Sequence, residues 1–291
     1  MPFNEQMFSS TRPLHIGYFV DDNSTRPVPA VERAVMWAVR ALEAQGHTVK
    51  KFDMKLYTRQ AFTNFLFKAL IADQGQGYDK LLQYDNTSEA MVNYHKFGKI
   101  PDWMRPLIAR SLQKDYNNVE KALFNAGNIR TITEWFQAVL DLQEFQQTFV
   151  EDWRQHELDV MISPPWPSPA NKSDTIENVT VCGTYTVIYN VLNFPAGVVP
   201  VTRVTSSDVK KTLDPTVYPV KNKQESILQT DAEGSEGLPI NVQVAGLIII
   251  IIIIIIIIIT TTTTITIHNE TKSNNLNVLN GKVIEVFSCL S

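Results

Sequence analysis

The sequence predicts an α/β layer structure with a parallel component in its sheet. Two apolar runs, residues 14–20 and 47–52, flank a stretch with helical periodicity, and such a strand–helix–strand succession is typical of parallel α/β units. Three more short apolar runs suit strands, at residues 159–163, 196–201 and 240–244. The chain between the second and third runs, residues 55–157, reads as mostly helical.

The first helix is the best defined of the predicted elements. Pro29 suits a first helical turn, and Gly46 supplies a stop. Between them, apolar residues recur at three-four spacing: Val31, Ala34, Val35, Ala38, Val39 and Leu42. We therefore expect one face of this helix to pack on the sheet.

The later segments give weaker predictions. A long helix is expected to bury one stripe made of Ile132, Trp135, Phe136, Val139, Leu142, Phe149 and Trp153. Residues 179–192 read as helical despite their β-branched content. The polar stretch 206–236, between two predicted strands, reads as a surface excursion.

Twelve consecutive isoleucines, residues 248–259, and a following threonine run mark a break after Ala245. A homopolymer cannot select one register or one set of core neighbours. We therefore divide the chain into an irregular start (1–12), a partial domain (13–245) and a low-complexity tail (246–291) that we expect to be non-native, as translated repeat DNA would be. Residues 244–267 are long enough for a membrane span but lack aromatic anchors and basic flanks, so we favour an aggregation-prone run instead.

Composition excludes several classes of protein. The formal net charge is −4, so the chain lacks the basic excess that is typical of nucleic-acid-binding proteins. Cys182 and Cys289 lie too far apart in sequence to support a disulfide scaffold or a zinc site, so a reduced, intracellular setting fits best. The five histidines are isolated and no phosphate-binding loop is present, so we predict no metal site and no cofactor. Neither Ser-Ser pair, Ser9-Ser10 or Ser206-Ser207, lies in a glycine-rich turn that could expose a nucleophile.

Residues 100–116, IPDWMRPLIARSLQKDY, combine an apolar stripe with basic charge. Around them, residues 96–121 carry six basic and three acidic side chains in an acidic protein. A basic amphipathic helix with a tryptophan suits a membrane interface, and an ordinary helix docked on the core is the alternative. Pro106 is expected to break this helix into two short pieces. The apolar stripe consists of Ile100, Trp103, Met104, Leu107, Ile108 and Leu112.

Four segments have a recognisable sequence: residues 13–49 (PLHIGYFVDDNSTRPVPAVERAVMWAVRALEAQGHTV), 158–170 (LDVMISPPWPSPA), 184–202 (TYTVIYNVLNFPAGVVPVT) and 237–245 (GLPINVQVA). In order and in spacing, they resemble the fatty acid amide hydrolase family of the amidase-signature serine hydrolases. The GLP-strand motif is shared across the superfamily, whereas YNVLNFPAGVVPVT is similar to the fatty-amide branch. The resemblance ends where the isoleucines begin.

The resemblance implies the C-terminal portion of an α/β/α amidase-signature fold with a mixed twisted sheet. It also implies hydrolysis of the C–N bond of long-chain N-acyl amides by a Ser-Ser-Lys triad. In the family, that triad and its glycine-rich signature precede the segment matched here, and no residue of this sequence corresponds to them. We therefore expect the chain to be a C-terminal fragment that is inactive by itself, with no catalytic residue of its own.

What the resemblance carries over is the substrate-binding part. Ile71, Thr180, Gly183 and Val187 align with positions similar to the family's acyl-chain channel, and residues 97–116 align with its hydrophobic membrane cap. The implied partners are a lipid amide substrate and a membrane interface, not nucleic acid, and a homodimer is left open. The implied setting is intracellular and peripheral on membranes.

Two alternatives to the fragment hypothesis stay open. One is a non-catalytic paralogue that binds lipid amides or a partner. The other is an amidase-signature enzyme acting on soluble amides, against which the apolar cap and the FPAGVV sequence argue.

Overall fold

A computed structural model describes residues 12–70, 72–73, 76–81, 83–84, 99–111 and 129–246 of the chain. Within these residues, five strands form one mixed sheet in the order β2-β1-β3-β5-β4. β1 (His15–Tyr18) pairs in parallel with β2 (Thr48–Lys51) and with β3 (Val160–Ser163). β5 (Pro239–Gly246) runs antiparallel to β3 and to β4 (Ala196–Arg203). The predicted α/β class and the mixed sheet are both confirmed.

The first strand–helix–strand unit follows the prediction closely. Helix α2 (Pro29–Ala44) has proline at its first turn, and all six residues of the predicted stripe are buried. The helix ends before Gly46, whose φ of +87° is a left-handed conformation that glycine adopts without steric cost. The stripe packs on the sheet and so defines one face of the core.

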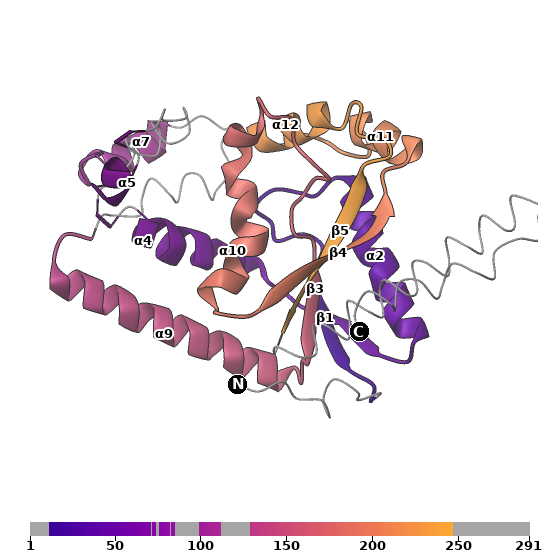
Figure 1. Cartoon of the computed structure of the whole chain (residues 1–291), viewed down its shortest axis with the longest axis horizontal. Helices are drawn as coiled ribbons and strands as arrows, with labels where there is room; N and C mark the ends of the chain where they lie inside the picture. The colour runs from indigo at the N-terminus through magenta and orange to yellow at the C-terminus, as the bar shows by residue number, and fades with distance from the viewer. Residues whose placement is uncertain are drawn as a thin grey trace, which may run out of the picture.

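Helices cover both faces of the sheet (Figure 1). On one face, α2 packs over Ile16, Val160 and Val244 in the larger hydrophobic cluster. On the other face, α9 (Ile132–Gln155) and α10 (Thr184–Val191) pack over Met161 and Ala245 in a second cluster. Because successive strand residues point to opposite faces, neighbours such as Val160 and Met161 serve different cores. The result is an α/β/α sandwich.

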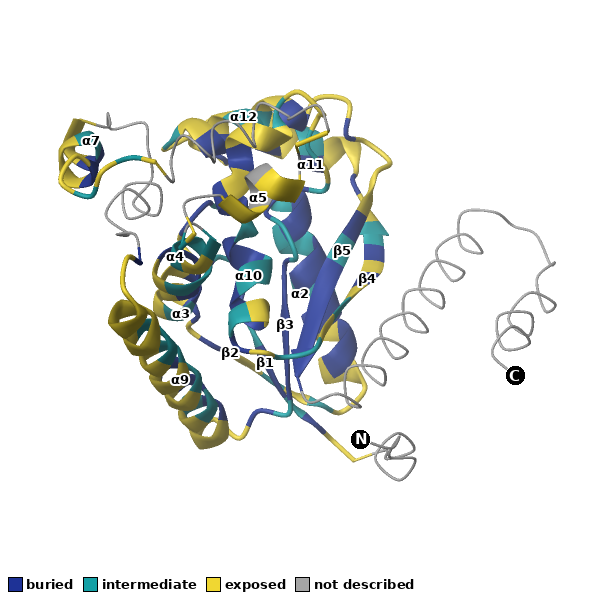
Figure 2. Ribbon diagram, turned by 60° about the vertical axis from the view of Figure 1, so that its left-hand side comes forward, coloured by how far each residue is buried: buried dark blue, intermediate teal, exposed yellow. Residues whose placement is uncertain are grey.

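The long helix α9 corrects one prediction. Its buried residues are Phe145, Phe149 and Trp153, all in its C-terminal half. Phe149 and Trp153 pack against Phe194, and Phe145 packs against Tyr57 and Phe65. Ile132 and Phe136, expected in the buried stripe, are 73% and 63% exposed, and Trp135 is also exposed. The N-terminal half of α9 extends away from the sheet, and its exposed face is evident in Figure 2. Periodicity located the helix correctly but could not tell which turns have a packing partner.

The segment after β2 is helical, as expected, in several short pieces. α3 (Lys55–Gln60), the π-helix η1 (Ala61–Leu66) and α4 (Phe67–Leu70) follow without a break, and α5 (Gln76–Leu81) and α7 (Arg105–Ser111) come later. The π-helix widens one turn by a residue, a distortion that is frequent at functional sites. It packs against α10 and so brings residues 61–66 next to residues 184–191.

Residues 176–191 form two helices rather than one. The 3₁₀ helix η2 (Ile176–Gly183) contains a kink at Val179, with φ −120° and ψ 23°, and α10 begins directly after it. The predicted helix over residues 179–192 is therefore confirmed in type but is divided at Gly183. This division places the first turn of α10 against the loop that follows β1.

The stretch 206–236, expected as a surface excursion, contains helices that we did not predict. It contains α11 (Ser206–Leu213) and α12 (Lys223–Asp231), which begin at the N-caps Thr205 and Asn222. Each cap oxygen accepts a hydrogen bond from the backbone three residues later, and Asp208 completes a capping box at α11. Side-chain caps, rather than an apolar stripe, mark the starts of these polar helices.

Candidate functional site

Three of the predicted acyl-channel residues lie within the described chain, and two of them meet. A Cβ atom built on Gly183 would lie 3.7 Å from Phe62 Cε2 of η1, 3.9 Å from Trp166 Cζ3 and 3.9 Å from Val187 Cγ2. We call these four residues, Gly183, Val187, Phe62 and Trp166, the Gly183 wall. Val187 also packs with Phe62 in a small cluster separate from the two main cores. Ile71 lies outside the described residues.

The Gly183 wall is apolar, and its glycine is not required by the backbone. Gly183 has φ −61° and ψ −12°, which any residue adopts, so glycine is not needed here to relieve backbone strain. A Cβ atom at this position would be in van der Waals contact with Phe62, Trp166 and Val187, and a longer side chain would have to displace them.

Thr180 belongs to the same short helix as Gly183 but is not part of the Gly183 wall. It is exposed on η2, and its hydroxyl donates a hydrogen bond to the Glu177 carbonyl at 3.0 Å. Side chains three residues apart in a 3₁₀ helix share a face, so Thr180 lies on the Gly183 side of η2. A role for Thr180 in binding stays a prediction.

Behind the wall lies a buried polar network that the sequence did not indicate. Asp22, in the loop after β1, accepts hydrogen bonds at Oδ1 from the Ser24 backbone N–H and hydroxyl. The Ser24 Oγ lies 2.6 Å from Thr184 Oγ1 at the start of α10. Next to it, the Tyr185 hydroxyl donates to the Thr25 carbonyl at 2.9 Å. The loop after β1 is thus bound to the first turn of α10.

The charge on Asp22 is disfavoured by its surroundings. Asp22 is 2% exposed, and its burial raises the pKa of its carboxyl to about 6. Hydrogen bonds from Ser24 and Thr184 lower this pKa but do not outweigh the effect of burial. Burial, with the charges of Asp22 and Asp21, also raises the pKa of Tyr185 well above its ordinary value. Tyr185 therefore stays a neutral hydrogen-bond donor.

Three of the buried serines among the described residues form hydrogen bonds within the fold. The Ser163 hydroxyl lies 3.2 Å from the Tyr189 hydroxyl, and Ser168 donates to Asn171 Oδ1 at 3.1 Å. Ser24 bonds Asp22 and Thr184 as described above. None of these contacts includes a lysine, whose neutral amine a Ser-Ser-Lys triad requires. No group of three metal-ligating side chains occurs in the described part of the chain.

A groove between η1 and α9 differs in character from the Gly183 wall. Its volume is about 530 Å³, and its lining residues include the aromatic Tyr57, Phe65 and Phe145 and the charged Lys68, Asp141 and Glu144. Desolvating one ammonium and two carboxylates opposes occupation by a long hydrocarbon chain. The Gly183 wall is thus the better candidate for an acyl chain.

In its described residues, 99–111, the predicted membrane-interface segment contains one short helix, α7. Pro106 lies in the first turn of α7 and does not break it, which corrects the prediction of two pieces. Trp103 is 71% exposed and Leu107 is 54% exposed, while Met104 is also exposed and Ile100 and Ile108 are half-buried. Leu112 lies outside the described residues.

The buried side of this segment is polar at its centre. The Arg105 guanidinium is buried and donates a hydrogen bond to the Ile100 carbonyl at 3.2 Å, with Asp102 Oδ1 at 3.4 Å. The apolar side chains are thus presented outward while the arginine faces the protein. No helix among the described residues is long and apolar enough to span a bilayer.

Comparison with known proteins identifies the family. The family model described as Amidase matches residues 1–248. The chain is 30% identical to fatty-acid amide hydrolase 1 of Sus scrofa over 85% of its own length and 42% of that protein, and 31% identical to fatty acid amide hydrolase 1 of Caenorhabditis elegans over 84% and 41%. A solved structure of a fatty acid amide hydrolase matches its fold with a TM-score of 0.59 at 17% identity, covering 90% of this chain and 42% of that one.

The chain thus spans about two fifths of the length of the curated relatives that it matches. The family match extends over the whole sheet and both helical layers, including β5, η2 and α10. The chain therefore belongs to the amidase family.

Proposed function

We propose that this chain is the acyl-binding part of an amidase acting on long-chain N-acyl amides, and that by itself it binds such amides without cleaving them. The observation that carries the proposal is the Gly183 wall: an apolar surface on which Phe62 of the π-helix and Trp166 adjoin Gly183 and Val187 at the start of α10. A hydrocarbon chain gains roughly 0.8 kcal/mol for each methylene group that it buries against such a surface.

The relatives support the choice of substrate class. Two curated relatives at 30% and 31% identity are fatty acid amide hydrolases by name, and the chain matches them over 85% and 84% of its own length. Hydrolysis of an amide needs an activated nucleophile and oxyanion donors, and the serine contacts found here supply neither. Binding without turnover is therefore the activity that we propose for the isolated chain.

Binding of primary fatty amides of increasing length tests this proposal. The full chain is titrated with radiolabelled octanamide, dodecanamide and hexadecanamide, and we expect the affinity to rise with each lengthening of the chain. Acetamide serves as the competitor for the alternative in which the protein belongs to a branch acting on soluble amides. Equal or stronger binding of acetamide than of hexadecanamide would favour that branch and contradict the proposal.

A membrane-surface location is part of the same proposal. Support comes from Trp103, Met104 and Leu107, which are exposed beside a basic segment, because tryptophan and leucine on a basic face favour the bilayer interface. A lipid amide would reach the protein from that surface. We propose an intracellular, peripheral location for this reason, and we keep a homodimer as a hypothesis to be tested by sedimentation equilibrium.

A further inference from the structure

The first half of α9 exposes large apolar side chains on one face. Ile132, Phe136 and Leu140 are 73%, 63% and 57% exposed, and Trp135 is 43% exposed. Residues three and four positions apart share one side of a helix, so these four side chains form one continuous stripe, which we call the α9 face. Single exposed apolar residues are common, but a contiguous apolar patch marks a place where another surface binds.

The α9 face contains no charged residue. The nearest acidic residues along the helix are Glu134, Asp141 and Glu144, and the 3.6-residue repeat places them on the opposite side. Asp141 and Glu144 line the groove between η1 and α9, so they are directed towards that groove and not towards the α9 face. A helix with an uncharged aromatic and aliphatic face is suited to lie in the plane of a bilayer surface.

Ion pairs join the start of α9 to residues 99–111. Asp102 Oδ2 lies 2.8 Å from Arg130 Nη2, and Asp102 Oδ1 lies 3.4 Å from Arg105 Nε. Trp103 directly follows Asp102, and Ile132 is two residues after Arg130. In Figure 1, α7 and the first turn of α9 both lie on the left, away from the sheet. One carboxylate therefore holds the α9 face beside the segment proposed above to contact a membrane.

The surroundings of this combined surface are basic. Lys99 and Arg110 are exposed on residues 99–111, and the Arg130 side chain is 53% exposed. Asp102 is paired with arginine, and Glu134 accepts a hydrogen bond from the Arg130 backbone N–H at 2.6 Å. Basic side chains beside an uncharged apolar surface complement a bilayer that contains anionic lipids. The charges thus favour such a bilayer as the partner of the α9 face.

We propose that the α9 face is a second membrane-binding element, which enters the same leaflet of an anionic bilayer as Trp103 and Leu107. This inference rests on the proposed function, because a membrane-surface location is part of that proposal. It extends the contact from one short helix, α7, to two elements that Asp102 joins. Contacts at two separate elements fix one orientation of the protein on the bilayer, which a single short helix does not.

The double variant Ile132→Ser, Phe136→Ser tests the inference. Binding of the full chain to vesicles of phosphatidylcholine and phosphatidylserine is measured by sedimentation, and circular dichroism verifies the fold. We expect at least about thirtyfold weaker binding, because both apolar side chains are mostly exposed in water and would be buried in the bilayer. The matched control is Leu213→Ser, Val217→Ser, at 39% and 41% exposed positions on and after α11, which packs next to α2. The control should stay within about twofold of the wild type.

Fluorescence quenching locates α9 on the vesicles directly. Phosphatidylcholine with brominated acyl chains quenches tryptophans that enter the bilayer. Trp135 belongs to the α9 face, whereas Trp37 of α2 packs on the larger core. We expect Trp135→Phe to reduce the emission that brominated vesicles quench, and Trp37→Phe to leave it unchanged. Equal quenched emission in Trp135→Phe and in the wild type would overturn the inference.

The outcomes separate this inference from the proposed function. If the wild-type chain binds no vesicles, the proposed membrane location fails and this inference fails with it. If Trp103→Ser, Leu107→Ser loses vesicle binding while Ile132→Ser, Phe136→Ser binds as the wild type does, this inference alone is overturned. Equal losses in the control variant also overturn it, as does a loss of dimer with unchanged vesicle binding, which would assign the α9 face to a second copy of the chain. Should the double variant fail to fold, Leu140→Ser gives the same comparison with one exposed residue, and selective loss of vesicle binding in either variant supports the inference.

Discussion

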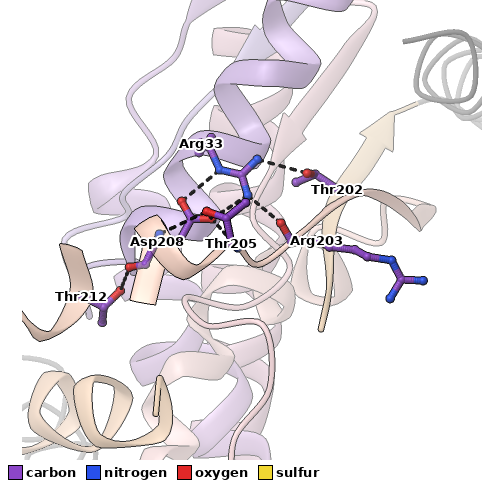
Figure 3. Close-up of polar contacts among 6 residues, drawn as sticks. All are labelled: Arg33, Thr202, Arg203, Thr205, Asp208 and Thr212. Atoms are coloured by element: carbon purple, nitrogen blue, oxygen red, sulfur yellow. Dashed lines mark hydrogen bonds and ion pairs between the residues drawn. The ribbon is translucent and has the colours of Figure 1, made fainter. Parts of the chain in front are cut away.

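The Arg33 guanidinium of α2 forms a two-point ion pair with the Asp208 carboxylate of α11, with Nε–Oδ1 at 3.0 Å and Nη2–Oδ2 at 2.7 Å (Figure 3). Arg33 also donates to the Thr202 hydroxyl and to the Arg203 carbonyl, so one side chain joins a helix, a strand end and the capping box of α11. This junction holds the 206–236 segment on the α2 side of the molecule.

Replacing Arg33 should therefore destabilise the fold. Arg33→Gln leaves the Asp208 carboxylate, whose side chain is 4% exposed, without its cationic partner. Because the Arg33 side chain is itself one-third exposed, we expect a loss of about 2 kcal/mol in the free energy of unfolding, below the value for a fully buried pair. Urea unfolding of the wild type and of Arg33→Gln measures this loss in the free energy of unfolding. Arg40→Gln, at an exposed position of the same helix, is the control and should change stability by less than about 0.5 kcal/mol.

The same pair gives a pH dependence with a definite sign. Burial raises the pKa of Asp208, but hydrogen bonds from Arg33 and Thr205 outweigh it, so the pKa lies below its ordinary value. A depressed carboxyl pKa stabilises the fold at pH values above the unfolded pKa, and this contribution disappears as the pH falls through the folded pKa. We expect Asp208→Asn to lose most stability near neutral pH and little at strongly acidic pH. If the free energy of unfolding of Asp208→Asn differed from that of the wild type by the same amount at every pH, the stabilising role of the ion pair would be contradicted.

Asp22 should show the opposite pH dependence. Its pKa is raised to about 6, so the folded state holds this proton more tightly than the unfolded state does. Stability from this group is complete below the unfolded pKa and is lost as the pH rises through the folded value. Between about pH 4 and pH 7, Asp22→Asn should therefore become more stable relative to the wild type, by on the order of 2 kcal/mol. Unfolding curves that stay parallel across this range would contradict the assignment.

Gly183 offers a way to alter binding while leaving the fold intact. Its backbone conformation suits any residue, so Gly183→Ala should unfold at the same or slightly higher urea concentration. Gly183→Ile should push against Phe62 and Trp166, alter the apolar wall and weaken hexadecanamide binding at least tenfold, while octanamide is affected less. Titration of both variants with both amides measures this. Unchanged hexadecanamide affinity in Gly183→Ile would place the acyl chain elsewhere.

The membrane proposal predicts a local effect of two side chains. The double variant Trp103→Ser, Leu107→Ser should bind vesicles of phosphatidylcholine and phosphatidylserine at least about thirtyfold more weakly in a sedimentation assay, since each apolar side chain contributes roughly 1–2 kcal/mol. Leu56→Ser is the matched control, because Leu56 is 70% exposed but lies on α3 outside the basic segment. Equal losses of vesicle binding in the double variant and in Leu56→Ser would mean that residues 100–111 do not form a specific membrane interface.

The sheet and α2 could be predicted from the sequence because their signals are local. The apolar runs at 14–20 and 159–163 became β1 and β3, and the stripe from Val31 to Leu42 became the buried face of α2. The helices α11 and α12 were missed because both are polar and depend on the caps at Thr205 and Asn222. The N-terminal half of α9 was misjudged for a different reason: an apolar stripe is buried only where another element meets it.

The candidate site shows the same limit more clearly. Gly183 and Val187 were expected from the resemblance to known amidases, and the structure brings them together with Phe62 and Trp166. The link from Asp22 through Ser24 to Thr184 crosses 160 residues of sequence, and no spacing rule connects them. The acidic and hydroxyl run that follows β1 was a visible signal, but it reads equally well as an ordinary turn.

The central claim is that this chain provides a binding wall for an acyl chain but no nucleophile. Labelling of the purified full chain with a fluorophosphonate probe, which reacts with activated serines, tests it directly in the presence of bound hexadecanamide and without it. We predict saturable hexadecanamide binding with no labelled serine in either sample. A stoichiometrically labelled serine, protected by hexadecanamide, would show that the chain contains its own catalytic centre and would contradict the account.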